Sequence, residues 1–274
     1  FGNKFKVTTW GESHGKALGA VIDGCPAGLP LCEEDIQKFL DRRKPGQSRY
    51  TTARKEGDLV EILSGVFEGK TTGTPISLMV RNTDQRSRDY GNIAYSYRPG
   101  HADYTFDQKY GFRDYRGGGR SSGRETIGRV AAGAIASKIL EELGISICTY
   151  TRSIGPVEIA SFNKEEIHQN AFYMPDAQAA VKAGEYLEEC MKNQDSAGGV
   201  IECRITGTPA GLGEPVFDKL SALLAHALMS IGAVKAVEIG DGIAVTSSNG
   251  STDNDGFTVK DGEIIKTSNH AGGI

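Results

Sequence analysis

The sequence lacks the features that mark several common classes of protein. No apolar run approaches the ~20 residues that a membrane-spanning helix needs, and no basic segment followed by an apolar one stands at its start. Its five cysteines are odd in number and include no Cys-x-x-Cys pair. A Gly-x-x-x-x-Gly-Lys-Ser/Thr phosphate loop is also absent. We therefore expect reduced thiols in a cytoplasmic protein, with no membrane span, no disulfide framework, no metal site and no nucleotide-dependent phosphotransfer.

Positive charge is in slight deficit overall but is concentrated in one segment. The chain carries 31 basic and 35 acidic residues, for a net charge of −4. Residues 42–129 hold 17 basic against 10 acidic residues, a balance of +7, and the remainder has a balance of −11. Nucleic acid is one partner for such a segment. Arginines among glycines, with few lysines and no aromatic stacking cluster, instead favour a small phosphorylated ligand.

The densest part of this basic segment is a glycine-arginine stretch at residues 113–135. Three consecutive glycines begin at Gly117, and Ser122 stands three residues before Glu125, the spacing of a capping box. Apolar residues then recur at helical spacing up to Gly144. The pattern predicts a loop leading into a helix N-terminus, which attracts anions; the alternative is a solvated loop. Five arginines accompany it: Arg113, Arg116, Arg120, Arg124 and Arg129.

Two histidines lie in predicted turns. Ser13 and His14 belong to Gly-Glu-Ser-His-Gly at residues 11–15, between strands expected at residues 5–10 and 19–23. His101 belongs to Arg-Pro-Gly-His-Ala-Asp at residues 98–103, after a long polar loop at residues 82–98. A histidine that titrates near neutral pH can act as a general acid. For His14, packing or capping of the loop is an equal alternative.

The rest of the pattern predicts alternating strands and helices. Helices are expected at residues 33–43, 176–192 and 216–230, and His226 of the last is interpreted as a core or interface histidine. Between the first helix and the next strand, the basic loop at residues 47–55 is either a phosphate-binding lid or a solvated surface loop. Further strands are expected at residues 59–63, 65–67, 75–81, 145–154, 156–159, 198–205 and 233–239. A strand followed by Pro-Ala-Gly-Leu and a helix occurs twice, which suggests an internal pseudo-twofold repeat.

The ordered motifs resemble those of the chorismate synthase family over the whole chain. The run at residues 11–15 and the Gly-Arg-Ser-Ser-Gly-Arg-Glu-Thr run at residues 119–126 resemble two family signatures. Matching motifs also occur at residues 41–43, 48–52, 98–103, 113–119, 226–231 and 268–273. The family continues past the position of Ile274, so we expect a C-terminally incomplete chain. It commonly has Asn-Ala where this chain has Gly232 and Ala233.

The resemblance implies a lyase of aromatic amino acid biosynthesis. Its substrate would be 5-enolpyruvylshikimate 3-phosphate, and a 1,4-elimination of phosphate would give chorismate, the last step of the shikimate pathway. The reaction needs reduced FMN, and the flavin would be reduced either with NADPH by the enzyme itself or by an external reductant. The implied fold is a single α/β domain over residues 1–274, a sandwich of helices packed between antiparallel sheets. The implied assembly is a homotetramer that binds neither nucleic acid nor membrane.

The resemblance also implies roles for individual residues. His14 would give a proton to the departing phosphate, and His101 would protonate the reduced flavin. The FMN contacts would be Arg120, Ser121, Ser122, Gly232 and Ala233. The substrate contacts would be Ser13, Arg43, Arg49, Arg98 and Arg124.

Overall fold

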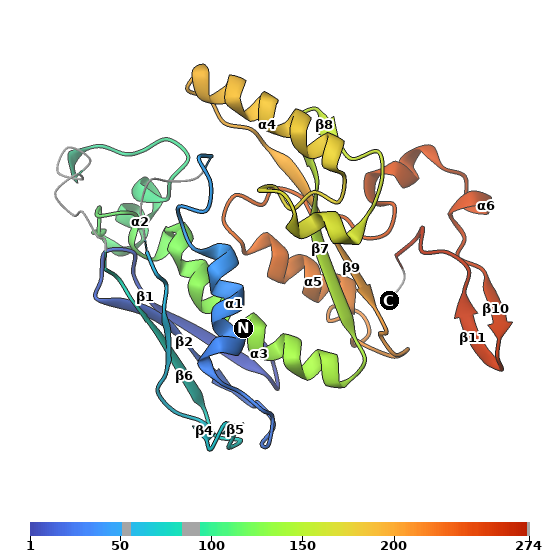
Figure 1. Ribbon diagram of the computed structural model, residues 1–274, viewed down its shortest axis with the longest axis horizontal. Helices are drawn as coiled ribbons and strands as arrows, with labels where there is room; N and C mark the ends of the chain where they lie inside the picture. The colour runs from blue at the N-terminus through green and yellow to red at the C-terminus, as the bar shows by residue number, and fades with distance from the viewer. Residues whose placement is uncertain (51–55, 84–93, 273–274) are drawn as a thin grey trace. The chain divides into compact units, whose positions relative to one another are not determined.

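The computed structural model of the chain describes residues 1–50, 56–83 and 94–272, and it divides into two compact units (Figure 1). The first unit is Phe1–Gly207 and the second is Thr208–Ile274. Parts of the predicted loops at residues 47–55 and 82–98 lie outside the described residues. In the part of the chain that the structure describes, no helix is both long and apolar enough to cross a membrane.

The first unit is built on a four-stranded antiparallel sheet in the order β1-β2-β6-β3. Its strands are β1 (Lys6–Gly11), β2 (Ala17–Asp23), β3 (Val60–Ile62) and β6 (Ile76–Arg81). In β6, Ile76, Leu78 and Val80 are buried and alternate with more exposed residues, the two-residue period of a strand with one covered face. Gly19 of β2 has no room for a side chain, because an added Cβ would collide with the carbonyl of Leu78.

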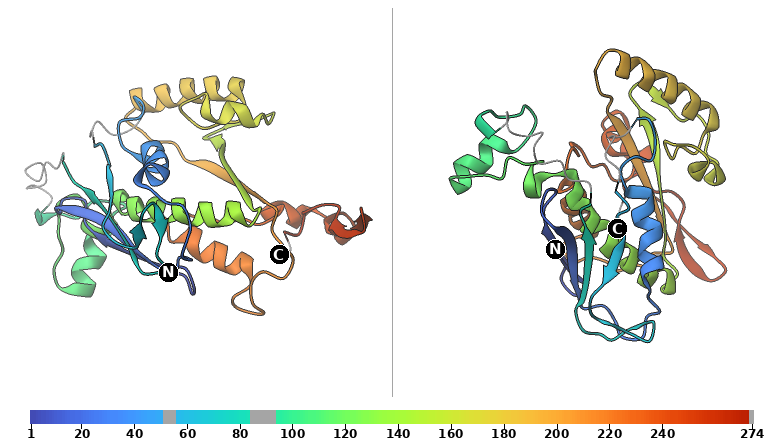
Figure 2. Two further views of the ribbon diagram at one scale, coloured as in Figure 1. Left: turned by 60° about the horizontal axis from the view of Figure 1, so that its bottom comes forward. Right: turned by 60° about the vertical axis from the view of Figure 1, so that its left-hand side comes forward.

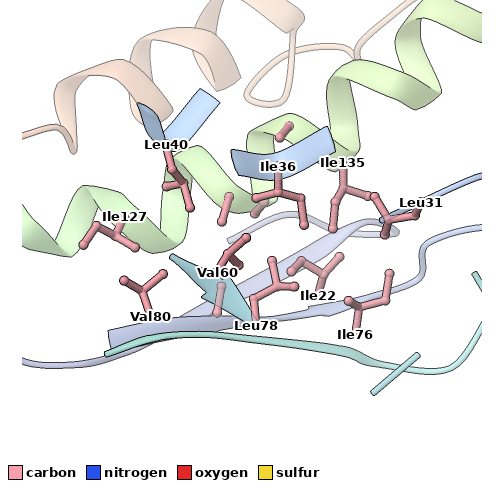
Figure 3. Close-up of a cluster of buried hydrophobic side chains, with 14 of the residues drawn as sticks. Ile22, Leu31, Ile36, Leu40, Val60, Ile76, Leu78, Val80, Ile127 and Ile135 are labelled. Carbon is pink, nitrogen blue, oxygen red and sulfur yellow. The ribbon is translucent and has the colours of Figure 1, made fainter. Parts of the chain in front are cut away.

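Two helices cover one face of this sheet, α1 (Glu33–Arg43) and α3 (Thr126–Glu142) (Figures 2 and 3). Ile36 and Ile135 are fully buried in the same core as Ile22 of the sheet. Full burial of such a side chain stabilises the fold by about 1.5–3 kcal/mol. Gly128 of α3 lies so close to β1 and β2 that an added Cβ would meet Thr9 and the carbonyl of Gly19. This packing places the start of α3 beside the turn between β1 and β2.

A second antiparallel sheet of the first unit has the order β8-β7-β9. It contains β7 (Ser146–Ile154), β8 (Val157–Glu158) and β9 (Gly199–Thr206), and α4 (Ala177–Lys192) packs near β8 through a small core around Met174 and Ala183. Asp176 caps α4 by accepting hydrogen bonds of 3.0 Å from the amides of Gln178 and Ala179. The short elements β4 (Val66–Phe67), β5 (Lys70–Thr71) and α2 (Asp103–Tyr110) complete the unit.

The second unit contains α5 (Leu220–Met229), α6 (Gly250–Asp253), and a hairpin of β10 (Phe257–Lys260) and β11 (Glu263–Lys266). No apolar side chain among residues 208–272 is buried, and Phe217 is 88% exposed. His226 is exposed on α5, so it is not a core residue, and its other interpretation as an interface residue stays a prediction.

The predicted α/β fold with helices on antiparallel sheets is confirmed, with most elements within two residues of the expected bounds. Two local predictions are wrong. Residues 233–239 form no strand, and the helix expected from residue 216 begins at Leu220. The single domain and the pseudo-twofold repeat stay predictions.

Candidate active site

Ser13 and His14 are buried in the turn that joins β1 to β2. Gly11 ends β1 with a φ of +85°, and the amide of Gly15 donates to the carbonyl of Glu12 at 3.1 Å. The turn leaves Ser13 only 3% exposed and His14 only 8% exposed. The sequence therefore places a hydroxyl and an imidazole at the end of the sheet, largely shielded from bulk water.

The triple-glycine loop packs against His14. Gly117, Gly118 and Gly119 have φ values of +62°, +84° and +53°, conformations that residues with a side chain rarely adopt. An added Cβ on Gly117 would collide with Nδ1 of the His14 ring. Gly117 is thus required both by its backbone conformation and by its close approach to the imidazole.

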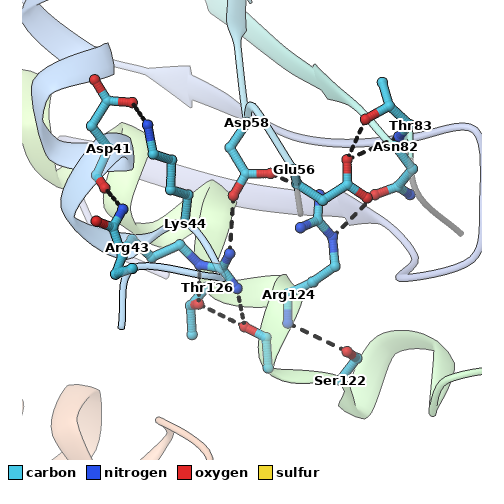
Figure 4. Close-up of polar contacts among 12 residues, drawn as sticks. Asp41, Arg43, Lys44, Glu56, Asp58, Asn82, Thr83, Ser122, Arg124 and Thr126 are labelled. Carbon is cyan, nitrogen blue, oxygen red and sulfur yellow. Dashed lines mark hydrogen bonds and ion pairs between the residues drawn. The ribbon is translucent and has the colours of Figure 1, made fainter. Parts of the chain in front are cut away.

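Two of the predicted substrate-binding arginines share one buried carboxylate, that of Asp58 (Figure 4). Nη1 of Arg43 lies 3.1 Å from Asp58 Oδ2, and Nη2 of Arg124 lies 3.0 Å from Asp58 Oδ1. Arg43 also donates to the carbonyl of Gly123 at 3.0 Å and to Thr126 Oγ1 at 3.1 Å. These contacts join the end of α1 to the start of α3.

Arg124 is the most buried of the predicted substrate-binding arginines, with a side-chain exposure of 6%. Its Nε donates to Oδ1 of Asn82 at 3.1 Å. Its Nη1 is buried and has no hydrogen-bond partner among the described residues. A buried guanidinium N–H without an acceptor is unfavourable. An anion that accepts a hydrogen bond from Nη1 would remove this penalty.

The predicted capping box at Ser122 and Glu125 is wrong. Ser122 caps a short 3-10 turn, Gly123–Glu125, by accepting from the amide of Arg124 at 3.3 Å. The carboxylate of Glu125 instead accepts from Thr9 Oγ1 at 2.7 Å and from Arg129 Nε at 2.9 Å. Glu125 is thus used to hold α3 against β1.

The three predicted flavin contacts of the first unit lie beside the glycine loop with different orientations. Arg120 donates to the carbonyl of Gly11 at 2.7 Å and to Thr9 Oγ1 at 2.7 Å, so its guanidinium is directed onto β1. Ser121 is exposed, and its hydroxyl donates to the carbonyl of Gly118 at 2.7 Å. Ser122 lies at the entry to the 3-10 turn.

Arg98 and His101 share the segment before α2. Arg98 binds Asp103 with two parallel contacts of 2.9 Å, and these, with the backbone amide of Arg98, hold the pKa of Asp103 at about 2. An added Cβ at Gly118 would lie 3.6 Å from Nη2 of Arg98, so this arginine borders the glycine loop. His101 is exposed, and its amide donates to the carbonyl of Arg98 at 3.2 Å.

The remaining predicted site residues are Arg49, Gly232 and Ala233. Arg49 forms an ion pair with Glu188 of α4 and donates to the hydroxyl of Tyr50 at 2.7 Å. Gly232 and Ala233 follow α5 in the second unit, and Ala233 has a φ of +70°.

Asp58 and Asn82 are two functional candidates that the motifs did not identify. Asp58 lies just before β3, and Asn82 directly follows β6. Asp58 is one of ten acidic residues in the basic segment, so its position in the sequence does not distinguish it, and Asn82 carries no signal either.

The fold and the site define an α/β protein in which a buried histidine turn lies beside two arginines paired on one carboxylate. A family model for chorismate synthase matches residues 5–274. Alignments to two relatives named chorismate synthase cover the whole of this chain. The one from Agathobacter rectalis is 67% identical and 75% covered, and the one from Lachnoclostridium phytofermentans is 65% identical and 76% covered. A crystal structure of chorismate synthase matches with a TM-score of 0.83 and 34% identity, over 99% of this chain and 79% of that one. The chain belongs to the chorismate synthase family.

Proposed function

We propose that the chain catalyses the 1,4-elimination of phosphate from 5-enolpyruvylshikimate 3-phosphate to give chorismate. The family and the identity of 67% to a chorismate synthase support this assignment. The observation that carries it in the site is the buried Nη1 of Arg124, which has no partner among the described residues and would donate a hydrogen bond to an oxygen of an anion. The substrate has a phosphate and two carboxylates, and paired arginines suit such groups.

The roles of the first-unit residues follow from their chemistry. Arg43 and Arg124 would bind one anionic group of the substrate from the two sides of Asp58, and Arg98 would bind another across the glycine loop. His14, with Ser13 beside it, would give a proton to the departing phosphate, because a phosphate leaves more readily when protonated. Arg49 would join the substrate only after leaving Glu188.

Reduced FMN is the cofactor that the family implies, and the residues present fit it in part. Gly123 has open space in place of a side chain, and Ser121 and Ser122 offer hydroxyls beside it. These residues, with Arg120, would hold the flavin, and the family motifs imply contacts from Gly232 and Ala233 as well. Bound there, reduced FMN would lend an electron to the substrate transiently. His101, on the exposed segment before α2, would supply the proton to the reduced flavin.

The test is an anaerobic assay of the full-length enzyme with substrate and FMN. We expect equal amounts of chorismate and phosphate when dithionite reduces the flavin, and no turnover with oxidised flavin. Replacing dithionite by NADPH, without an added reductase, determines whether the enzyme reduces its own flavin. Failure to form chorismate with reduced FMN would overturn the assignment. We also infer a cytoplasmic homotetramer from the family, which light scattering of the purified enzyme would check for assembly.

A further inference from the structure

Asn82 uses every hydrogen-bonding group of its side chain to connect two parts of the site. Its amide nitrogen donates to the carbonyls of Glu12 and Gly15, at 2.9 Å and 2.8 Å. These two carbonyls flank the turn that holds Ser13 and His14. Its amide oxygen accepts from Nε of Arg124 at 3.1 Å. One side chain therefore contacts both the turn of the proton donor and the arginine that binds the anion.

The backbone around Asn82 is itself fixed. The amide of Asn82 donates to the carbonyl of Lys16 at 3.1 Å, which continues the pairing of β6 with β2 beyond Arg81. The next residue, Thr83, donates from its amide and its hydroxyl to the buried carboxylate of Glu56, at 3.0 Å and 2.6 Å. The side-chain amide is thus held from both sides, and its three contacts are made by a group with little freedom to move.

We propose that Asn82 is a positioning residue that sets the separation between His14 and Arg124. Proton transfer to a leaving group depends on placement, and a misplacement of about 1 Å costs on the order of 100-fold in rate. The inference rests on the proposed function, in which Arg124 holds the substrate and His14 gives the proton. Without the amide, the turn and the guanidinium would each keep their other contacts but lose the group that links them.

The chain offers a matched control in Asn170. Its amide nitrogen donates to the carbonyls of Glu166 and Met174, at 2.9 Å and 2.8 Å, and its oxygen accepts from the amides of Phe172 and Met174 at 3.1 Å. It therefore ties a loop with the same groups, and none of its side-chain hydrogen bonds to the described residues reaches the candidate site. A general loss of stability from deleting such an amide should appear equally in both positions.

The first measurement is a kinetic double-mutant cycle in the full-length enzyme with reduced FMN. We expect Asn82→Ala to lower kcat by about 100-fold, and Asn170→Ala to lower it less than threefold at a temperature where both are folded. In a His14→Ala background, Asn82→Ala should cost less than threefold, because its partner in the reaction is gone. Asn82→Asp, which keeps the volume and the acceptor but loses both N–H donors, should also lower kcat and serves if the alanine variant does not fold. Equal losses from Asn82→Ala in the two backgrounds would overturn the inference.

The second measurement does not depend on turnover. The chain has five histidines, so their ring Cε1–H signals can be assigned by NMR with His14→Ala as the reference for His14. Asn82→Ala or Asn82→Asp should move or broaden the His14 signal and leave the other four in place, and Asn170→Ala should leave His14 unchanged. An unmoved His14 signal in both Asn82 variants would overturn the positioning role. If the parent enzyme forms no chorismate while the signal moves as expected, the proposed function fails and the link between Asn82 and the histidine turn stands.

Discussion

Two regions of the first unit hold an arginine of the same basic segment against a carboxylate, in opposite environments. Asp58 has a side-chain exposure of 0%, and its partners Arg43 and Arg124 are 19% and 6% exposed. Arg49 and its partner Glu188 are 66% and 42% exposed. Water and salt screen an exposed pair and leave it little net stability, whereas a buried charge that loses its partner is strongly unfavourable. We infer that Asp58 and its two arginines are a fixed part of the site. The substrate can displace the exposed pair of Arg49 and Glu188.

The largest effect is expected from removing the buried charge. Asp58→Asn keeps the shape of the side chain but leaves two arginines without their shared carboxylate, so the free energy of unfolding should fall by about 3–5 kcal/mol. Urea unfolding of the full-length protein measures this loss. Glu188→Gln is the matched control at the exposed pair, and its unfolding curve should overlay that of the parent. Similar losses in the two variants would remove the distinction between the regions.

A smaller effect, mainly on kcat, is expected at the glycine loop that packs against His14. Gly117→Ala adds a Cβ that collides with the His14 ring, so we expect kcat to fall by about 100-fold through displacement of the imidazole. Gly111→Ala is the control, because Gly111 has a similar φ of +78° but open space around an added Cβ. Both variants carry the strain of a left-handed residue, about 1–2 kcal/mol, so any further loss of stability in Gly117→Ala reports the collision with His14. Equal kcat values in the two variants would show that the glycine loop does not hold His14.

The sequence predicted the elements around this site better than the contacts within it. The strand at β6 and the helix α1 were predictable because their apolar residues repeat with the period of a sheet face or a helix face. Residues 233–239 are mostly apolar, yet they form no strand, since a strand also needs a hydrogen-bonded neighbour and none pairs with them among the described residues. The apolar residues of a short segment do not specify which strand it would pair with.

The contacts of single polar side chains depend on segments distant in the sequence. Arg43 and Arg124 were predicted as neighbours only through the family motifs, and nothing in the spacing placed Asp58 between them. The capping box failed for the same reason, because Glu125 had a stronger alternative in Thr9 and Arg129 once α3 was packed on β1. Packing decides which of several locally reasonable hydrogen bonds is made.

The smallest effect is expected at the exposed pair, and it concerns binding alone. If Arg49 must leave Glu188 to reach the substrate, Glu188→Gln removes a competitor for the guanidinium and should lower KM for the substrate a few-fold, with kcat unchanged. Arg49→Lys should instead raise KM for the substrate, because an ammonium cannot reproduce the two parallel hydrogen bonds that a guanidinium gives to a phosphate or carboxylate. Initial rates over a range of substrate concentrations, with reduced FMN saturating, measure both.

Arg152→Lys is the control for a charge-conserving change, since Arg152 pairs with Glu158 and Glu202 on the second sheet. The two predicted shifts have opposite signs, so a general loss of stability cannot produce both. A KM that is unchanged in Glu188→Gln and in Arg49→Lys would mean that this arginine belongs to the surface and takes no part in binding.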